Sequence, residues 1–327
     1  MRCGMADLRG TVKAVCISEK RGTEKKNVHR GHFIPHHGIE KDAHAGDWHR
    51  QVSLLSFEKI EEFNRQGAGV DLGAFGENLV IEGIDLGTLP VGSIFRAGTA
   101  VLKMTQIGKE CHDHCAIYHR MGVCIMPRNG VFAEVLREGD IEEGDEFVVE
   151  LPDPDRPFSA AVITLSDKAS KQERVDESGP TAVKILSEAG YEVVETLILP
   201  DEEEQLKKQL IRLADARQVD LILTTGGTGF SLRDRTPEAT LAVMDRNAPG
   251  IAEYMRMKSS EITDRAMLSR GVSVIRGTTL IINLPGSPKA VEESLGFILN
   301  ALDHGIRILR GSASECGRMV TSGPISE

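Results

Sequence analysis

The chain has 327 residues, 40% of them hydrophobic, and this length and composition predict two domains with buried cores. The formal net charge of −10 and a pI near 5.6 argue against a general nucleic-acid-binding or anionic-membrane surface, but they allow a local basic pocket for a phosphorylated small molecule. No apolar run reaches the roughly 18 residues of a membrane helix, the N-terminus lacks a signal-peptide pattern, and six cysteines are few for a secreted disulfide scaffold, so a cytoplasmic location is expected.

A composition boundary divides the chain. Nine of the ten histidines lie before residue 120. Between Glu150 and Phe158 the sequence ELPDPDRPF contains three prolines and alternating acids, which prevent both a helix and a central strand. We therefore expect a first domain over residues 1–150, a proline-rich linker over 151–157, a second domain over 158–311 and a C-terminal tail over 312–327.

Short β-rich runs fill the first part, separated by turns that contain Gly, Asp and Pro. They are TVKAVCIS, QVSLLS, ENLVIEG, SIFRAG and AVLKMTQIG. These runs predict a mostly β barrel or sandwich. One helix is predicted from a cap at Ser56 to Gly67, with Phe57, Ile60 and Phe63 on one face, and we expect it to cover an end of the barrel.

The stretch GKECHDHCAIYHRMGVC, Gly108 to Cys124, holds three cysteines and three histidines. In a reducing compartment, clustered thiols bind metal or react more often than they form disulfides. A zinc-type site could use Cys111, His114 or Cys115, His119 and Cys124, although their spacing is not a standard paired motif. Packing alone is a third interpretation. The isolated cysteines at positions 3, 16 and 316 are expected to be inert.

The second part changes to a βαβαβ order: strand SAAVITLS, helix SGPTAVKILSEAG, strand YEVVETLILP, helix DEEEQLKKQLIRLADA and strand VDLILTTGG. The later run TTLIINLPGSP adds a strand, and PKAVEESLGFILNALDHGIRILRG adds a closing helix. Continuous apolar strands that alternate with amphipathic helices predict an α/β doubly wound, mainly parallel sheet, with ligands bound where the strands end.

Polar or glycine-rich residues follow four of these strands. GGTG, Gly226 to Gly229, could let backbone amides approach a phosphate, or it could be only a tight turn. Asp234 lies between two arginines, a setting that suits magnesium and phosphate or a plain surface ion pair. Asp201 ends a strand and could also cap the next helix. Of the other two strand ends, one carries Ser166 and Asp167, and the other carries NLPGSPK, Asn283 to Lys289. This inventory fits phosphoryl or nucleotidyl transfer.

An ordered set of motifs in this part resembles the molybdopterin adenylyltransferase family of molybdenum-cofactor biosynthesis. The set comprises SD at Ser166, DESGP at Asp176, LPDE at Leu199, TTGGTG, RDRTPEAT, PGIAEYMR, LSRG and NLPGSPKA, and it covers about residues 158–311. The resemblance implies that the terminal phosphate of molybdopterin attacks the α-phosphate of Mg-ATP, which gives adenylylated molybdopterin and pyrophosphate. It also implies a homotrimer or an assembly of trimers.

The resemblance also implies roles for individual residues. Asp201 and Asp234 match the two acids associated with nucleotide, Mg²⁺ and catalysis. The matches to the phosphate, nucleotide and pterin sites are Ser166, Asp167, Ser178, Gly226, Gly227, Thr228, Gly229, Asn283, Pro285, Gly286, Ser287 and Lys289. Glu253 and Arg256 match the motif that follows Pro249 and Gly250. Phe230 departs from the pattern, because proline is expected after TTGGTG.

The first part resembles the MOSC domain, named for the C terminus of molybdenum-cofactor sulfurase. The resemblance rests on GIEKDAHAGDWHRQVSLLS, GAFGENLVIEGIDLGTLPVGSIFRAG, the cysteine cluster and GVFAEVLREGDIEEGDEF, and it spans about residues 9–150. It implies a β-barrel-like domain that binds molybdenum cofactor or related ligands and handles sulfur. Cys111 best matches the sulfur-carrying cysteine, and a persulfide on it would need the thiolate that Lys109 and nearby histidines favour. Histidines 44 and 49, with Trp48, are polar loop residues that could contact a ligand.

Together these resemblances predict a two-domain protein of molybdenum-cofactor biosynthesis, with Mg²⁺, ATP and molybdopterin at the second domain and a persulfide on Cys111 in the first. Molybdenum-insertion and sulfur-donor proteins are the expected partners. The alternative is a molybdopterin or molybdate carrier without turnover, in which the Cys/His cluster forms a structural metal site.

Overall fold

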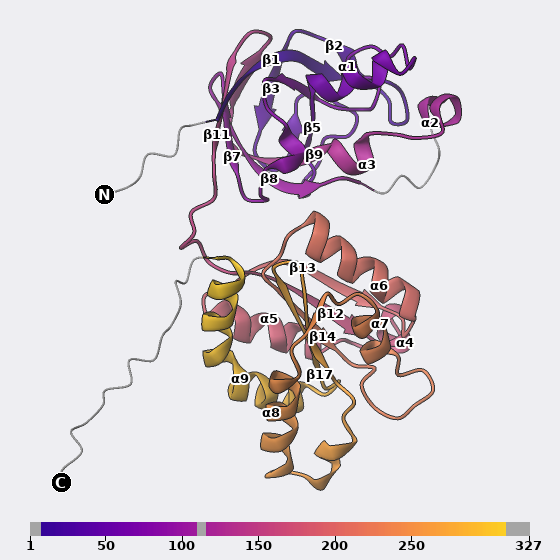
Figure 1. The fold of residues 1–327 in the computed structure, drawn as a ribbon, viewed down its shortest axis with the longest axis vertical. Coiled ribbons are helices and arrows are strands. Elements are labelled where there is room, and N and C mark those ends of the chain that lie inside the picture. Colours follow the sequence, from indigo (N-terminus) through magenta and orange to yellow (C-terminus); the bar gives the residue numbers. More distant parts are fainter. Residues whose placement is uncertain (1–7, 110–115, 312–327) are drawn as a thin grey trace, which may run out of the picture. The chain divides into compact units, whose positions relative to one another are not determined.

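A computed structural model describes residues 8–109 and 116–311. The chain folds into two compact units that meet in sequence at Asp153 and Pro154. Unit 1 comprises Met1–Asp153 and Asp215–Gln218, and unit 2 comprises Pro154–Ala214 and Val219–Glu327. The last strand before this point ends at Glu150 and the next begins at Ser159, so the proline-rich stretch connects the two units (Figure 1). In the described part of the chain, no helix has both the length and the apolar character needed to cross a membrane.

Unit 1 is a seven-stranded β-barrel, which confirms the mostly β fold class. The described part of unit 1 has eleven strands, seven of them in the barrel: β1 (Leu8–Ile17), β2 (Lys26–Asn27), β3 (Arg30–Ile34), β4 (Gly38–Ile39), β5 (Val52–Ser56), β6 (Leu79–Glu82), β7 (Ile94–Ala97), β8 (Ala100–Ile107), β9 (Val131–Arg137), β10 (Gly139–Glu142) and β11 (Glu146–Glu150). The ring runs β11-β7-β8-β9-β5-β6-β1 and closes where β1 pairs antiparallel with β11, with Leu8 opposite Val149. The two-residue strand β2 pairs with the end of β1 outside this closed ring. Strands β10, β3 and β4 form a separate small sheet.

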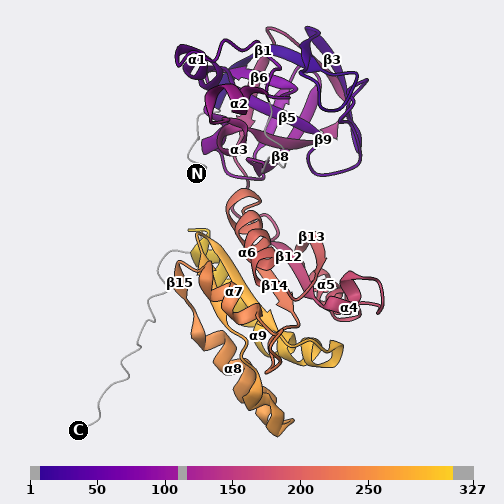
Figure 2. The same cartoon turned by 90° about the vertical axis from the view of Figure 1, so that its right-hand side faces the viewer.

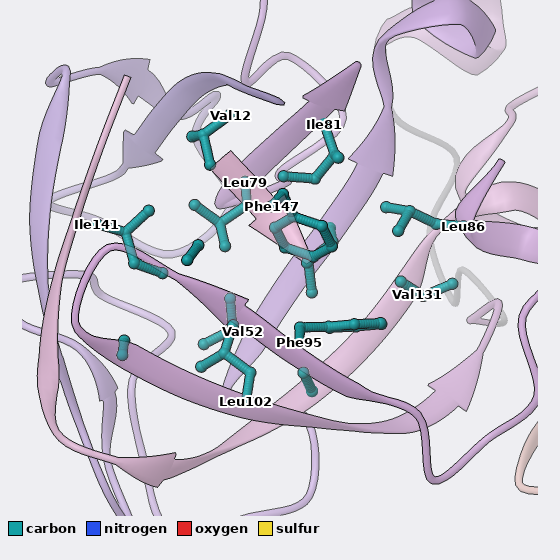
Figure 3. Close-up of a cluster of buried hydrophobic side chains, with 14 of the residues drawn as sticks. Val12, Val52, Leu79, Ile81, Leu86, Phe95, Leu102, Val131, Ile141 and Phe147 are labelled. Carbon is teal, nitrogen blue, oxygen red and sulfur yellow. The ribbon is translucent and has the colours of Figure 1, made fainter. Parts of the chain in front are cut away.

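Alternation along the strands separates an inner and an outer set of apolar side chains. The inner set fills the barrel and includes Phe95 and Phe147, whose ring centroids lie 5.1 Å apart (Figure 3). The helices of unit 1 are α1 (Phe57–Arg65), the 3₁₀ turn η1 (Leu86–Thr88), α2 (Ala116–Met121) and α3 (Met126–Asn129). Helix α1 packs its buried Ile60 and Phe63 against the outer set, with Leu55 and Val80. The helix was therefore predicted correctly, but its expected position over an end of the barrel is wrong, because it covers the outer wall.

Unit 2 is an α/β domain with a six-stranded sheet, and the predicted doubly wound, mainly parallel fold is confirmed. Its strands are β12 (Ser159–Leu165), β13 (Glu192–Leu199), β14 (Leu221–Thr225), β15 (Arg246–Asn247), β16 (Ser273–Arg276) and β17 (Thr279–Leu284). Its helices are α4 (Asp167–Ser170), α5 (Ser178–Glu188), α6 (Glu203–Ile211) with the π turn η2 (Arg212–Ala216), α7 (Thr236–Ala242), α8 (Pro249–Ser260), the 3₁₀ turn η3 (Asp264–Leu268) and α9 (Pro288–Leu309). The strand order is β13-β12-β14-β17-β16-β15.

Helices cover both faces of this sheet (Figures 1 and 2). One core joins the sheet to α5, α8 and α9, for example through Leu186, Met255 and Leu295. The other core joins it to α6 and α7, for example through Leu206 and Ala239. Strands β12, β13, β14 and β17 are parallel, whereas β16 and β15 add an antiparallel edge. The four parallel strands therefore present their carboxyl ends on one side of the sheet.

Candidate functional site

The ends of three parallel strands surround one cavity in unit 2. Strand β12 lies between β13 and β14, so the chain connections change direction between β12 and β14, and open α/β sheets bind ligands at such a point. A cavity of about 110 Å³ lies there. Its lining includes Ser166 after β12, Gly226 after β14 and Gly286 after β17. The structure therefore brings together three strand ends that were predicted to carry site residues.

The turn after β14 accepts only glycine at its first two positions. Gly226 and Gly227 have φ values of +96° and +64°. A Cβ atom at Gly226 would lie 2.4 Å from the backbone oxygen of Leu165, and one at Gly227 would lie 2.3 Å from Oγ1 of Thr236. Thr236 fixes the turn, because its Oγ1 donates to the oxygen of Gly226 at 3.0 Å and its backbone N donates to the oxygen of Gly227 at 3.2 Å. The turn is thus a rigid backbone surface beside the cavity.

The two predicted acids lie at this turn. A Cβ atom at Gly227 would be 3.3 Å from Oδ1 of Asp201, and a Cβ atom at Gly229 would be 3.0 Å from Oδ2 of Asp234. Glu202 occupies the N-cap position of α6, so the alternative role of Asp201 as a helix cap is not seen. The structure therefore brings Asp201 and Asp234 against the same four-residue turn, although 33 positions separate them in the sequence.

Asp167 connects Asp201 to a guanidinium group. The backbone N of Asp167 donates to Oδ2 of Asp201 at 3.0 Å, and the backbone N of Asp201 donates to Oδ1 of Asp167 at 3.1 Å. Arg233 donates to both oxygens of Asp167, from Nε at 3.1 Å and from Nη2 at 2.8 Å, and its Nη1 lies 2.9 Å from Oε1 of Glu202. The loops after β12 and β13 are thereby joined to the loop that carries Asp234.

The electrostatics of these acids differ. Burial raises the pKa of the Asp201 carboxyl above its ordinary value. The backbone N–H of Asp167 opposes that change, but the negative charges of Asp167 and Asp234 add to it. Hydrogen bonds from Arg233, and then the backbone N–H of Asp201, lower the pKa of Asp167. The carboxylates of Asp201 and Asp234 at one turn favour a bound cation.

The donor set fits a magnesium ion that is bound together with its substrate. The described residues contain no group of three or more His, Cys, Asp or Glu side chains arranged to hold a metal alone. Mg²⁺ is commonly bound by one or two carboxylates, with water and substrate phosphates completing its octahedral shell. Asp201 and Asp234 supply two carboxylates next to the glycine turn, which is the donor set of such a site.

The predicted serines occupy helix starts around the cavity. Oγ of Ser166 accepts from the N of Ala169 at 3.2 Å and caps α4, and Oγ of Ser287 caps α9 in the same way. Ser178 begins α5, and its hydroxyl donates to Oδ1 of Asp176 at 3.0 Å. These caps use N–H groups of the first turns, and what the starts of α5 and α9 add for an anion is the positive end of the helix macrodipole.

The other predicted residues have varied surroundings. Asn283 is buried, and its amide donates to Thr224 and Thr240, each at 2.9 Å. Pro285 lines a second cavity of about 180 Å³ together with Asn283 and Arg256. The remaining three predicted residues are Thr228, which is buried in the turn, Lys289, which is exposed and lies 3.8 Å from Glu293, and Glu253, which is exposed on α8.

The cysteine cluster of unit 1 falls largely outside the described residues. Cys111 and Cys115, with His112 and His114, lie in the segment 110–115 that the structure does not describe. Cys124 is half-buried. Cys16 is fully buried, and burial, with the charge of Glu77, raises its pKa to about 12. A thiol with so high a pKa is unreactive at neutral pH, in agreement with the expectation for Cys16.

A buried ion pair lies next to His44 in unit 1. Nζ of Lys25 lies 2.7 Å from Oδ2 of Asp42, and both side chains are buried. Asp42 also accepts from the N of Ser18 at 2.9 Å, while Nδ1 of His44 lies 3.4 Å from the Ser18 hydroxyl. Burial, with the charge of Lys25, lowers the pKa of His44, so its imidazole is neutral at pH 7. His49 instead contacts Gln106, with Nε2 3.0 Å from Oε1.

Two polar residues at the site of unit 2 were not predicted from the sequence. Asp176 accepts from the N of Ser178, the N of Gly179 and Oγ1 of Thr164, at 3.1, 3.1 and 2.7 Å, and so orders the start of α5. Arg270 donates to the backbone at both ends of the loop between Gly229 and Asp234. Both residues stand in motifs of the resemblance, DESGP and LSRG, but nothing in the sequence indicated their contacts.

The fold and the site define a class of protein: an α/β domain with a glycine turn and two carboxylates at the switch point of a parallel sheet. Residues 161–304 match the family model of the probable molybdopterin binding domain, and residues 40–148 match that of the MOSC domain. The chain belongs to the molybdopterin-binding family that includes the molybdopterin adenylyltransferases, and it carries a MOSC domain before that part.

Curated relatives and a solved structure extend the comparison. A molybdopterin adenylyltransferase of Helicobacter pylori is 42% identical over 153 residues, which are 46% of this chain and 87% of that protein. The molybdopterin adenylyltransferase of Escherichia coli K12 is 42% identical over 152 residues, 44% of this chain and 77% of that protein. The crystal structure of the molybdopterin biosynthesis enzyme MoaB from Thermus thermophilus is 45% identical, with a TM-score of 0.46, and covers 47% of this chain and 97% of that one.

Proposed function

We propose that unit 2 transfers the adenylyl group of ATP to molybdopterin with the help of Mg²⁺. The observation that carries the proposal is that Asp201 and Asp234 lie against the glycine turn, whose first residue, Gly226, lines the cavity at the ends of β12, β14 and β17. Phosphate transfer needs backbone amides and cations around the phosphates and carboxylates for the metal, and little else from the protein. The names of the curated relatives favour molybdopterin as the acceptor.

Each part of the site has a distinct task in this reaction. The backbone N of Gly226 donates to the oxygen of Leu284 at 3.4 Å, so the amides of Gly227, Thr228 and Gly229 are the ones that would face the phosphates, and the glycines keep side chains out of their way. The starts of α4 and α9 border the same cavity through Ser166 and Pro288. Asp201 and Asp234 would hold Mg²⁺, which when bound neutralises charge on the phosphate oxygens.

The covalent change is one substitution at phosphorus. An oxygen of the terminal phosphate of molybdopterin forms a bond to the α-phosphorus of ATP, and the bond from that phosphorus to the bridging oxygen of the β-phosphate breaks. Pyrophosphate leaves with the electron pair. The protein contributes by orienting the two phosphates in line and by stabilising charge, which is the main source of rate enhancement in this class of reaction.

Turnover by the purified chain tests the proposal. We expect protein incubated with molybdopterin, ATP and Mg²⁺ to form adenylylated molybdopterin and pyrophosphate in equal amounts. Asp201→Ala and Asp234→Ala should abolish product while the oligomeric state and cooperative melting are unchanged. Molybdopterin binding without product would support the alternative of a carrier, and normal turnover by both variants would contradict the assigned roles.

For unit 1 we propose that the MOSC domain binds cofactor or handles sulfur through Cys111. The match to the MOSC family model and the unreactive environment of Cys16 support the choice of the cluster over the buried thiol. Intact-mass measurement should detect a persulfide that Cys111→Ser removes. Stoichiometric zinc that is lost on substitution of Cys111, Cys115 or Cys124 would instead favour a structural metal site.

We also propose that the protein assembles as a homotrimer or as a group of trimers. An apolar groove of about 610 Å³ on unit 2 is a suitable contact surface. It is lined by Ile251, Tyr254, Phe297, Ile308 and neighbouring residues of α8, α9, β16 and β17. Light scattering during size-exclusion chromatography should give three times the 35.7 kDa chain mass, or a multiple of that. A monomer at micromolar concentration would contradict this proposal.

A further inference from the structure

Arg270 lies between η3 and β16 and contacts the loop that carries Asp234. Its backbone N donates to the oxygen of Thr228 at 2.9 Å, and its Nε donates to the oxygen of Gly229 at 2.7 Å. Its Nη2 donates to the oxygen of Asp234. One arginine therefore bonds to the last two residues of the glycine turn and to the second metal-binding acid.

These bonds join the two ends of an exposed loop. Between Gly229 and Asp234 the side chains of Phe230 and Leu232 are 70% and 97% exposed, so their burial contributes little to holding the loop in place. Within the loop, the N of Ser231 donates to Oδ2 of Asp234 at 2.9 Å and the N of Asp234 donates to the oxygen of Ser231 at 3.0 Å. Those bonds shape the loop, and Arg270 attaches both of its ends to the core of unit 2.

A carboxylate in the first turn of α7 orients the guanidinium. Nη1 of Arg270 donates to Oε1 of Glu238. Burial alone would raise the pKa of Glu238, but the hydrogen bond from Arg270 and the charge of that residue outweigh it and lower the pKa, so Glu238 is ionised. The planar guanidinium can bond to three acceptors in fixed directions, whereas an ammonium group is a single point charge.

We propose that Arg270 is a positioning residue for the nucleotide phosphates: it sets the distance between the glycine turn and Asp234, so that amides and carboxylate act on one Mg-ATP. The inference rests on the proposed function, because it assigns the turn and Asp234 to the nucleotide. It goes further in predicting that the affinity for Mg-ATP depends on Arg270 and that the affinity for molybdopterin does not. The reason is geometric, since the bonds of Arg270 all lie on the turn, its loop and α7.

Equilibrium binding of Mg-ATP and of molybdopterin to the full chain tests this inference. For Arg270→Gln we expect the Kd of Mg-ATP to rise at least tenfold and the Kd of molybdopterin to change less than twofold. Arg270→Lys should restore part of the loss, because one of the three side-chain bonds can re-form. Glu238→Gln keeps the arginine and removes its ionic partner, so it should raise the Kd of Mg-ATP about threefold, by the energy of a weakened charged hydrogen bond.

Arg212 provides a matched control. Like Arg270, it bonds through all three guanidinium nitrogens and pairs with a partly buried carboxylate: both Nη atoms donate to Glu195, and Nε donates to Gln209 at 2.7 Å. Arg212→Gln should lower the melting temperature about as much as Arg270→Gln while both Kd values are unchanged.

The possible results separate the two proposals. If Arg270→Gln binds Mg-ATP as tightly as Arg212→Gln does, the positioning role is wrong. It is also wrong if Arg270→Gln raises the Kd of Mg-ATP and the Kd of molybdopterin by the same factor. If the wild-type chain binds Mg-ATP with the expected pattern but forms no adenylylated product, the proposed transfer is wrong and the positioning role stands. If the wild-type chain does not bind Mg-ATP, both proposals are wrong.

Discussion

Gly226→Ala tests whether the glycine turn must approach β12 as closely as it does. Gly226 combines a φ of +96° with a predicted Cβ contact of 2.4 Å to the backbone oxygen of Leu165. Gly190, after α5, is a matched control, because its φ is +87° and an added Cβ would meet no atom within 4 Å. Alanine at either position has the same backbone cost, but only at Gly226 does it meet another atom.

The expected magnitudes follow from this difference. A non-glycine residue in such a backbone conformation costs about 1–3 kcal/mol. Forcing β12 and the turn apart adds about 1–3 kcal/mol, the usual cost of overpacking. We therefore expect Gly190→Ala to lower the free energy of unfolding by about 1–3 kcal/mol and Gly226→Ala by about 2–6 kcal/mol. Each 1 kcal/mol corresponds to about 2–4 °C in melting temperature for a domain of 150–250 residues.

Activity should separate the two variants more sharply than stability does. A displacement of the order of 1 Å in a phosphate-binding turn can reduce turnover roughly 10²-fold. We expect that loss for Gly226→Ala and wild-type turnover for Gly190→Ala, measured as adenylylated molybdopterin at a temperature where both variants are folded. Equal melting temperatures and equal turnover of the two variants would refute the reasoning, because the contact with Leu165 would then have no consequence.

Three further predictions concern polar groups that the fold holds in fixed contacts. Burial raises the pKa of Glu77 from 4.5 to about 7, so the folded state binds this proton more tightly than the unfolded state. The contribution of Glu77 to the free energy of unfolding should therefore be complete below pH 4.5 and fall by roughly 3 kcal/mol as the pH rises to 7, so urea unfolding of the wild-type chain should lose about that much relative to Glu77→Gln over this range. Lys25→Met leaves the buried carboxylate of Asp42 without its ionic partner and should lower the free energy of unfolding in urea by about 3–5 kcal/mol. The double variant Lys25→Met/Asp42→Leu should recover much of this loss. An unchanged urea midpoint for the single variant would contradict burial of the pair. Asp176→Ala removes the acceptor at the start of α5 and should cost about 0.5–2 kcal/mol by calorimetry, whereas Glu173→Ala, on the exposed preceding loop, should cost almost nothing.

Hydrophobic periodicity predicted the main elements of both units. The runs predicted as strands in the first part became β1, β5, β6, β7 and β8, and the alternating strands and helices of the second part became the parallel sheet. The short strands β15 and β16 were not predicted. They have two and four residues, and pairing with neighbouring strands, which a sequence pattern does not contain, is what makes them strands.

Side-chain partners could not be predicted in the same way. Arg270 and Gly229 are 41 positions apart, and Thr164 and Asp176 come together only because α5 begins beside the end of β12. Asn283 was predicted as part of a ligand-site wall, and the sequence did not indicate that its amide donates to Thr224 and Thr240 while the residue also lines the cavity of about 180 Å³. The direction in which a residue near a strand end points depends on register and packing, and these are properties of the assembled sheet.

The sequence by itself determined where the chain turns and which chemistry the turns carry. Consecutive glycines after an apolar strand allow a backbone conformation with positive φ that other residues rarely adopt. Carboxylates at strand ends provide ligands for cations. Only the tertiary structure decided which of these groups meet: Asp201 and Asp234 lie at one turn because β12, β13 and β14 are neighbours in a parallel sheet. The conformation of a turn depends on a few adjacent residues, and the sequence therefore predicts it. Distant side chains come close only after strands pair and helices pack.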